Sequence, residues 1–177
     1  TDHVTIDNLT IVNNAFSEGW GILLTNDADH FTLTNSLVAT DSSGNFRSDV
    51  SPIAITADYE NDQQFGSQVD SVTISNCDLV GGEYTLSYYG NSATQDVSGF
   101  LLSNSNLRKF YRSAFYLYSV ENVEITENTI ISDISSIDED GIYAFDINNF
   151  NISGNTIQVK DWGIYINDGN DGNNPSI

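Results

Sequence analysis

The chain has 177 residues, of which 39% are hydrophobic and 11% aromatic, a composition typical of one folded domain and not of a disordered chain. Its 25 acidic and 5 basic residues give a formal net charge of −20, so nucleic acid and anionic membranes are expected to be repelled. No run of 18 apolar residues is present, which predicts no membrane insertion, and the single cysteine, Cys77, excludes an internal disulfide.

Six eight-residue segments share one pattern. They begin at Val4, Phe31, Val72, Phe100, Val123 and Phe150, at intervals of 27, 41, 28, 23 and 27 residues. Positions 1, 3 and 8 of each segment are apolar, positions 2 and 4 are mostly polar, and an asparagine stands at position 5 or 6. The alternation predicts a half-buried strand. The asparagine predicts a tight bend, because it tolerates the left-handed conformation, and position 8 is expected to return to the interior on the next strand.

A second strand is expected later in each repeat. The segments are 21–26, 52–57, 84–89, 114–119, 141–146 and 163–168. Stacked at the parallel-strand spacing, these units predict an all-β, right-handed parallel β-helix of about six coils, about 29 Å long. The longest interval holds insertion loops within 40–70, whose polar parts, 40–49 and 58–70, are expected to project from one edge. The whole chain, 1–177, is interpreted as a single domain, either a segment of a longer chain or a filament subunit.

The repeat is clearest in residues 122–130, NVEITENTI, and in residues 150–157, FNISGNTI. It resembles the repeat of the pectate-lyase-like superfamily, which reads roughly N-V-x-I-x-x-N-x-I. The resemblance covers nearly the whole chain and implies the β-helix fold. It implies no single activity, because this fold hosts lyases, hydrolases, adhesins, phage spikes and surface polymers.

Pectate lyases of that superfamily hold Ca²⁺ with carboxylates and use an arginine or lysine as the base beside a groove. The basic residues of this chain are few, and Arg108, Lys109 and Arg112 cluster in coil four. They either face an acidic substrate or compensate local charge. The motifs typical of galacturonases are absent, and no catalytic residue is assigned.

Acidic residues and both histidines stand just before the first repeats, where stacked coils bring them together. They are Asp2, Asp29, Asp70, His3 and His30. Stacked carboxylates suit Ca²⁺ and paired histidines suit a transition metal, whereas a solvated ladder of turns is the alternative. Near the C-terminus, Asp168 and Asp171 resemble half of a Ca²⁺ loop or form a flexible polar loop. Ca²⁺ is therefore the possible cofactor.

The excess of acidic residues has three interpretations. It favours solubility in high salt, binding of divalent cations between carboxylates, or simply an acidic, soluble surface.

Three tyrosines, Tyr116, Tyr143 and Tyr165, occupy equivalent outward positions in coils four to six. At the spacing of the coils they predict an aromatic ladder, beside which Asp146 and Asn167 are expected to bind hydroxyl groups. Such a ladder can bind sugar rings, form a protein interface, or stabilise the sheet by stacking between strands.

Neither end of the solenoid shows an amphipathic capping helix, so the apolar residues of the terminal coils are expected to be open. These residues are Val4, Ile6, Ile11, Phe150, Ile152 and Ile157. The preferred hypothesis is a non-enzymatic structural subunit of an extracellular or cell-surface filament, sheath or adhesin. It assembles head-to-tail with copies of itself or with a flanking β-helix. The alternative is a carbohydrate-active β-helix, either a polysaccharide lyase or hydrolase or a sugar-binding module.

Overall fold

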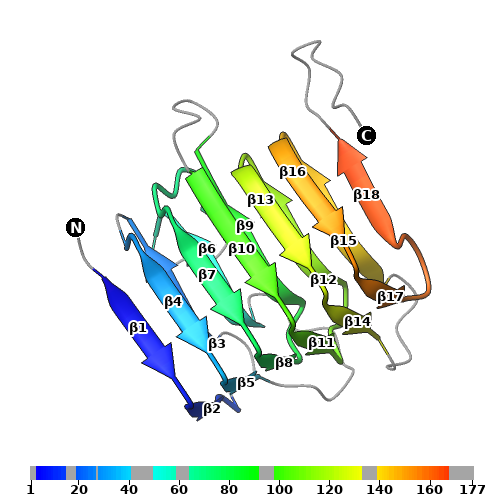
Figure 1. Cartoon of the computed structure of the whole chain (residues 1–177), viewed down its shortest axis with the longest axis horizontal. Helices are drawn as coiled ribbons and strands as arrows, with labels where there is room; N and C mark the ends of the chain where they lie inside the picture. The colour runs from blue at the N-terminus through cyan, green and yellow to red at the C-terminus, as the bar shows by residue number, and fades with distance from the viewer. Residues whose placement is uncertain are drawn as a thin grey trace.

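The computed structural model describes residues 3–14, 19–26, 28–40, 50–58, 64–91, 98–132 and 139–167. In these ranges the chain forms eighteen strands and no helix. The strands make three six-stranded sheets, and all the pairings between them are parallel. Figure 1 shows the strands following one another along the molecule, from β1 at one end to β18 at the other.

Each sheet takes every third strand of the chain. The first sheet contains β1 (Val4–Asp7), β4 (Phe31–Thr34), β7 (Val72–Ser75), β10 (Ser98–Ser103), β13 (Glu121–Thr126) and β16 (Asn148–Ser153). The second contains β2 (Thr10–Val12), β5 (Leu37–Ala39), β8 (Asp78–Val80), β11 (Asn106–Arg108), β14 (Thr129–Ile131) and β17 (Thr156–Gln158). The third contains β3 (Gly19–Thr25), β6 (Val50–Thr56), β9 (Tyr84–Tyr89), β12 (Ser113–Tyr118), β15 (Asp140–Phe145) and β18 (Ile164–Asn167).

One strand from each sheet makes a coil, so β1 to β3 form coil one and β16 to β18 form coil six. The predicted all-β parallel solenoid of about six coils is therefore confirmed. The unequal intervals in the sequence do not disturb the register. Leu33 pairs with Ile74 across the longest interval, and Phe100 pairs with Val123 across the shortest.

The apolar positions of the repeat fill the interior, as predicted. Position 3 is fully buried in the four inner coils, where its residues are Leu33, Ile74, Leu102 and Ile125. The third sheet meets them from the opposite side with side chains such as Ile53, Leu86 and Phe115, which are also fully buried. Burial of each such side chain contributes about 1.5–3 kcal/mol, so stacking of the coils supplies the driving force for folding.

Position 5 of the repeat forms the bend after the first sheet. Asn8, Asn35, Asn76 and Asn104 all adopt φ between 50° and 54° there, which confirms the role predicted for asparagine. In coils five and six the asparagine stands one position later. Glu127, with φ 57°, and Gly154, with φ 68°, take the bend instead.

Position 6 forms a hydrogen-bonded column along the inside of the same corner. In four of the five steps between coils, an oxygen of the position-6 side chain accepts the backbone N–H of the position-6 residue in the preceding coil, at 2.9–3.1 Å. The bonds run from Leu9 to Ser36, from Cys77 to Ser105, from Ser105 to Asn128 and from Asn128 to Asn155. Buried backbone groups at the corner are thereby satisfied.

Cys77 belongs to this column and is buried, with 2% of its surface exposed. Its thiol lies 3.2 Å from the carbonyl oxygen of Ser75. Burial raises the pKa of the Cys77 thiol, which keeps it protonated. The residue therefore acts as a small buried side chain of the corner.

Two parts of the insertion belong to the solenoid. β6 is a strand of the third sheet whose seven residues are all buried. Residues 64–70 lie along the end of β9, where the N–H of Ser67 donates to the carbonyl of Tyr89 at 3.0 Å. The hydroxyl of Tyr88 donates to the carbonyl of Val69, which lies in the core. Residues 64–70 therefore pack against the coils, whereas we expected 58–70 to project from the edge. The predicted loop residues 41–49 and 59–63 lie outside the described ranges. None of the described segments forms a helix able to cross a membrane.

Candidate functional site

The three tyrosines predicted to form a ladder lie side by side on the outer face of the third sheet. Tyr116 pairs with Tyr143, and Tyr143 pairs with Tyr165. The ring centroids are 5.9 Å and 4.8 Å apart, with interplanar angles of 27° and 17°. The rings are therefore stacked between coils, as predicted, and this contact stabilises the sheet.

The tyrosines belong to a larger aromatic surface. Among the described residues, nine rings form one connected set of ring contacts on this face: Phe65, Tyr84, Tyr89, Tyr116, Tyr118, Tyr143, Phe145, Trp162 and Tyr165. The Trp162 ring lies nearly parallel to that of Tyr143, at 6° and 6.1 Å, and it is 47% exposed. Phe65 and Trp162 are exposed, Tyr84 and Tyr89 are buried, and the other five rings are half-buried. A contiguous aromatic patch that is partly open to solvent is a candidate binding surface.

Trp162 reaches this surface because the alternation of the strands is broken where they begin. Strict alternation places residue 162 inside, together with Ile164 and Ile166. The preceding coils show why it lies outside. Ala114 is fully buried, and a Cβ added at Gly141 would lie 2.7 Å from the Cγ2 of Ile157, so the small residue faces the core. The residue that precedes this small residue then stays on the outer face, and in coil six that residue is Trp162.

A hollow of about 260 Å³ lies within the aromatic surface and combines aromatic walls with polar groups. Its lining residues are Tyr84, Arg112, Ser113, Tyr116, Asp140, Tyr143, Asp161 and Trp162. They come from coils three to six, so the hollow extends along the axis for about 14 Å at the spacing of parallel strands. Half of these residues are aromatic and half are polar or charged. Small-ligand sites likewise combine apolar walls with polar groups that fix the orientation of the ligand.

Buried acids hold the cations around the hollow. The Nη1 of Arg112 donates to Glu83 Oε1 at 3.0 Å and to the Tyr84 hydroxyl at 3.2 Å. The side chain of Glu83 is 3% exposed, whereas that of Arg112 is 54% exposed. The Nζ of Lys160 lies 3.2 Å from Glu139 Oε1, whose side chain is fully buried. Each cation therefore compensates a buried carboxylate.

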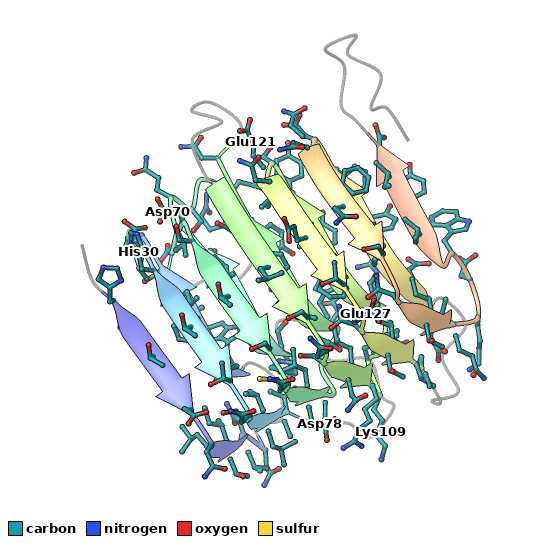
Figure 2. All side chains as sticks on the ribbon, in the orientation of Figure 1. His30, Asp70, Asp78, Lys109, Glu121 and Glu127 are labelled. Carbon is teal, nitrogen blue, oxygen red and sulfur yellow. The ribbon has the colours of Figure 1, made fainter. Side chains whose placement is uncertain are left out.

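The cluster predicted in coil four is divided between two faces of the solenoid. Arg108, at the end of β11 in the second sheet, binds both carboxylate oxygens of Asp78 at 3.0 Å and 2.6 Å. Arg112 directly precedes β12 of the third sheet and lines the hollow. Figure 2 labels Lys109 beside the corner near Asp78. Of the two interpretations of the cluster, these contacts agree with local charge compensation.

Asp140 provides the most constrained carboxylate of the hollow. Its Oδ1 accepts the backbone N–H of Trp162 at 3.1 Å, and its Oδ2 lies 3.5 Å from the hydroxyl of Ser113. Asp161 is exposed beside it. Asp146 and Asn167, which are expected to bind hydroxyl groups, are not among the residues that line the hollow. Asp146 accepts the hydroxyl of Ser119 at 2.6 Å.

The tyrosine hydroxyls of the hollow stay neutral over a wide pH range. Burial is the largest cause that raises the pKa of Tyr84, and the negative charge of Glu83 adds to it. Burial also raises the pKa of Tyr116 and of Tyr143, each with a further contribution from the neighbouring tyrosine. These hydroxyls can therefore both donate and accept hydrogen bonds to a ligand.

The predicted metal site lies at the opposite edge, where the first sheet begins. The rings of His3 and His30 are 4.4 Å apart, as predicted, and Asp29 Oδ1 accepts the N–H of Asp70 at 3.2 Å. Figure 2 shows His30, Asp70 and Glu121 along this edge. Within the described ranges no three His, Cys, Asp or Glu side chains converge to hold a metal ion. Asp2, Asp168 and Asp171 lie outside those ranges, and Ca²⁺ binding stays a prediction.

Of the apolar residues predicted to be open in the terminal coils, Val4 is 48% exposed. Leu9, Val12 and Ile164, which were not predicted, are 45–57% exposed in the same coils. The other predicted residues are half-buried and pack against the core: Ile6, Ile11, Phe150, Ile152 and Ile157.

The arrangement can bind a ligand that has both apolar faces and hydroxyl groups, because rings and hydrogen-bonding groups line the same hollow. No protein-family model, curated protein or solved structure matches the chain.

Proposed function

We propose that this protein is a non-catalytic, extracellular β-helix of the pectate-lyase-like superfamily that binds polysaccharide on the aromatic surface. The observation that carries the proposal is the hollow, in which Tyr84, Tyr116, Tyr143 and Trp162 surround Arg112, Asp140 and Asp161. The resemblance of the repeat to that superfamily, which includes polysaccharide lyases and hydrolases, supports the assignment.

Sugars match this hollow chemically. A pyranose ring has faces made of C–H groups, which pack on aromatic rings, and a rim of hydroxyls, which bond to carboxylates and tyrosine hydroxyls. The elongation of the hollow along the solenoid axis suits a chain of sugars rather than a single compact molecule. Arg112 is a poor candidate for a catalytic base, because it pairs with the buried Glu83 at 3.0 Å.

Substitution of aromatic residues that line the hollow tests the proposal. Glycan arrays identify a polysaccharide, and affinity electrophoresis measures its binding to the native protein and to Tyr143→Ala and Trp162→Ala. We expect each substitution to weaken binding by about tenfold or more, which corresponds to about 1.4 kcal/mol.

Trp20→Ala is the matched control. Trp20 occupies the same column of the third sheet as Trp162, since it pairs with Ser51, but it lies in coil one, about 24 Å away at the spacing of parallel strands. Its substitution is expected to leave binding unchanged. Unchanged binding by Trp162→Ala and Tyr143→Ala would remove the hollow as the site.

A second candidate function is longitudinal assembly into a surface filament or sheath, and the apolar side chains of the terminal coils favour it. We propose that the occupant is a second copy of this chain. Stacking coil one on coil six in the same register places Val4 over Phe150, Ile6 over Ile152 and Ile11 over Ile157. All six are apolar, so each step of the contact buries apolar surface.

Electron microscopy tests assembly. Filaments with a subunit rise of about 29 Å are expected, six strand spacings per copy. Val4→Asp and Ile164→Asp are expected to abolish them, whereas Tyr143→Ala leaves them intact. Monomers at all concentrations, or growth only on a different β-helix chain, would exclude the homopolymer.

A further inference from the structure

We infer that the hollow selects uncharged sugars and excludes uronic acids and sulfated glycans, an inference that rests on the proposed carbohydrate-binding function. The structure supports it in three ways. Arg112, the one cation among the described lining residues, is already paired. Two carboxylates stand beside it without a second cation in the lining. The remaining polar groups are neutral hydroxyls.

Arg112 is committed to Glu83. The side chain of Arg112 is 54% exposed, so a ligand can reach it, whereas the side chain of Glu83 is 3% exposed. A sugar carboxylate bound by the remaining N–H groups of Arg112 would share a cation whose charge already balances the buried carboxylate of Glu83. The arginine therefore attracts a uronate less strongly than an unpaired cation would.

The other charges of the hollow are negative. Asp140 is held in place by the N–H of Trp162 at 3.1 Å, so its carboxylate stays at the wall of the hollow. Asp161 is exposed on the next coil. The chain as a whole carries a formal charge of −20, which adds long-range repulsion of polyanions.

Neutral sugars meet none of these obstacles. The carboxylate of Asp140 accepts hydrogen bonds, so it binds the O–H groups of a sugar directly. The hydroxyls of Tyr84, Tyr116 and Tyr143 donate or accept as the ligand requires. The free N–H groups of Arg112 can bond to ring or hydroxyl oxygens without leaving Glu83.

A matched pair of polymers tests the inference on the full chain. Polygalacturonate and its fully methyl-esterified form share one backbone and differ in charge at every residue. Affinity electrophoresis at low salt is expected to show at least tenfold tighter binding of the ester. The ratio is expected to shrink as salt is added, because screening weakens the repulsion.

Two substitutions are expected to weaken the selection. Glu83→Gln releases Arg112 from its acid and is expected to raise the affinity for polygalacturonate about tenfold. Asp161→Asn removes an exposed carboxylate and is expected to raise it by a smaller factor, and this variant keeps the test valid if Glu83→Gln fails to fold. Asp78→Asn is the control, because it removes one charge and releases Arg108 on the second sheet, outside the hollow. It is expected to change neither affinity.

The outcomes separate the inference from the proposed function. Equal or tighter binding of polygalacturonate by the native chain overturns the charge selection and leaves the hollow as a sugar site. Failure of the native chain to bind any glycan on a broad array overturns the proposed function and, with it, this inference.

Discussion

The corner after the first sheet depends on single residues that tolerate the left-handed conformation. Asparagine holds this position in coils one to four, but in coil five it is held by Glu127, with φ 57°. A side chain other than glycine or asparagine typically costs about 1–2 kcal/mol in this conformation. The sequence predicted the bend, but the asparagine of coil five lies one position later. There Asn128 is buried and accepts the N–H of Ser105 at 2.9 Å.

Replacement of Glu127 by asparagine is therefore expected to stabilise the protein. We expect Glu127→Asn to raise the free energy of unfolding by about 0.5–1 kcal/mol, measured by urea denaturation, because asparagine adopts this conformation at lower cost. Glu124→Asn, on the exposed face of β13, removes the same charge without a bend. An equal gain in both variants would attribute the effect to charge alone.

Tyr88 makes the stability of the protein sensitive to high pH. Burial raises its pKa well above the ordinary value, with further contributions from Asp70 and Asp29. Above about pH 10 the unfolded chain releases the tyrosine proton while the folded chain keeps it. Stability is thus fully present below that pH and falls by about 1.4 kcal/mol per pH unit above it for each such tyrosine.

Tyr88→Phe is expected to remove this contribution from the alkaline slope of unfolding free energy against pH. At neutral pH it is expected to cost about 1 kcal/mol, since the carbonyl of Val69 loses its hydrogen bond from the Tyr88 hydroxyl. Urea denaturation at several pH values measures both effects. An unchanged alkaline slope in Tyr88→Phe would contradict the assignment.

At the scale of elements, the third sheet shows how far strand periodicity predicts a site. Alternation placed Tyr116, Tyr143 and Tyr165 outside correctly, because regular strands carry them. It could not place Trp162, because the alternation breaks where Ala114 and Gly141 face the core. The column three residues before the tyrosines contains Tyr84, Ser113, Asp140 and Trp162, so the signal was present in the aligned repeats. The sequence did not show that the side chains of this column point to the outer face.

The break in alternation makes Gly141 and Gly163 unequal. A Cβ at Gly141 would lie 2.3 Å from the carbonyl oxygen of Gly163, which forces a backbone shift. At Gly163 the nearest atom would be 4.0 Å away, an ordinary contact. We expect Gly141→Ala to lower the free energy of unfolding by about 1–3 kcal/mol and Gly163→Ala to change it little or to raise it slightly. Denaturant titration of both variants measures these changes. Equal changes in the free energy of unfolding would contradict the break in alternation at the start of these strands.

At the scale of the whole molecule, one repeated pattern was enough to predict the stack. The six copies share the same apolar positions, so only one alignment of the coils puts all of these side chains inside. The register could therefore be predicted although the intervals between copies vary from 23 to 41 residues. Phe65 marks the limit of this reasoning. It comes from the insertion, which has no counterpart in the other repeats, yet its ring lies 4.5 Å from that of Tyr118 on the aromatic surface. Periodicity contains no information about a segment that occurs once.

The excess of acidic residues also acts on the whole molecule. With 25 acidic and 5 basic residues, self-repulsion of the folded chain opposes its stability, and salt screens that repulsion. We expect the thermal midpoint to rise between about 0.02 M and about 0.5 M NaCl. CaCl₂ compared with NaCl at equal ionic strength tests the predicted Ca²⁺ binding, because screening alone gives the same rise with both salts.

Scanning calorimetry over a calcium titration distinguishes screening from binding. Screening depends only on ionic strength. A bound ion stabilises the folded state by RT ln(1 + [Ca²⁺]/Kd), so the thermal midpoint keeps rising with Ca²⁺ concentration even at constant ionic strength. A midpoint that rises with submillimolar Ca²⁺ against an NaCl background would support the predicted Ca²⁺ binding, and an unchanged midpoint would contradict it. Alanine substitution of Asp2, Asp168 and Asp171 would then locate the ion. These acids are more informative than Asp29, whose carboxylate already accepts the N–H of Asp70 and whose loss destabilises the coil without any metal.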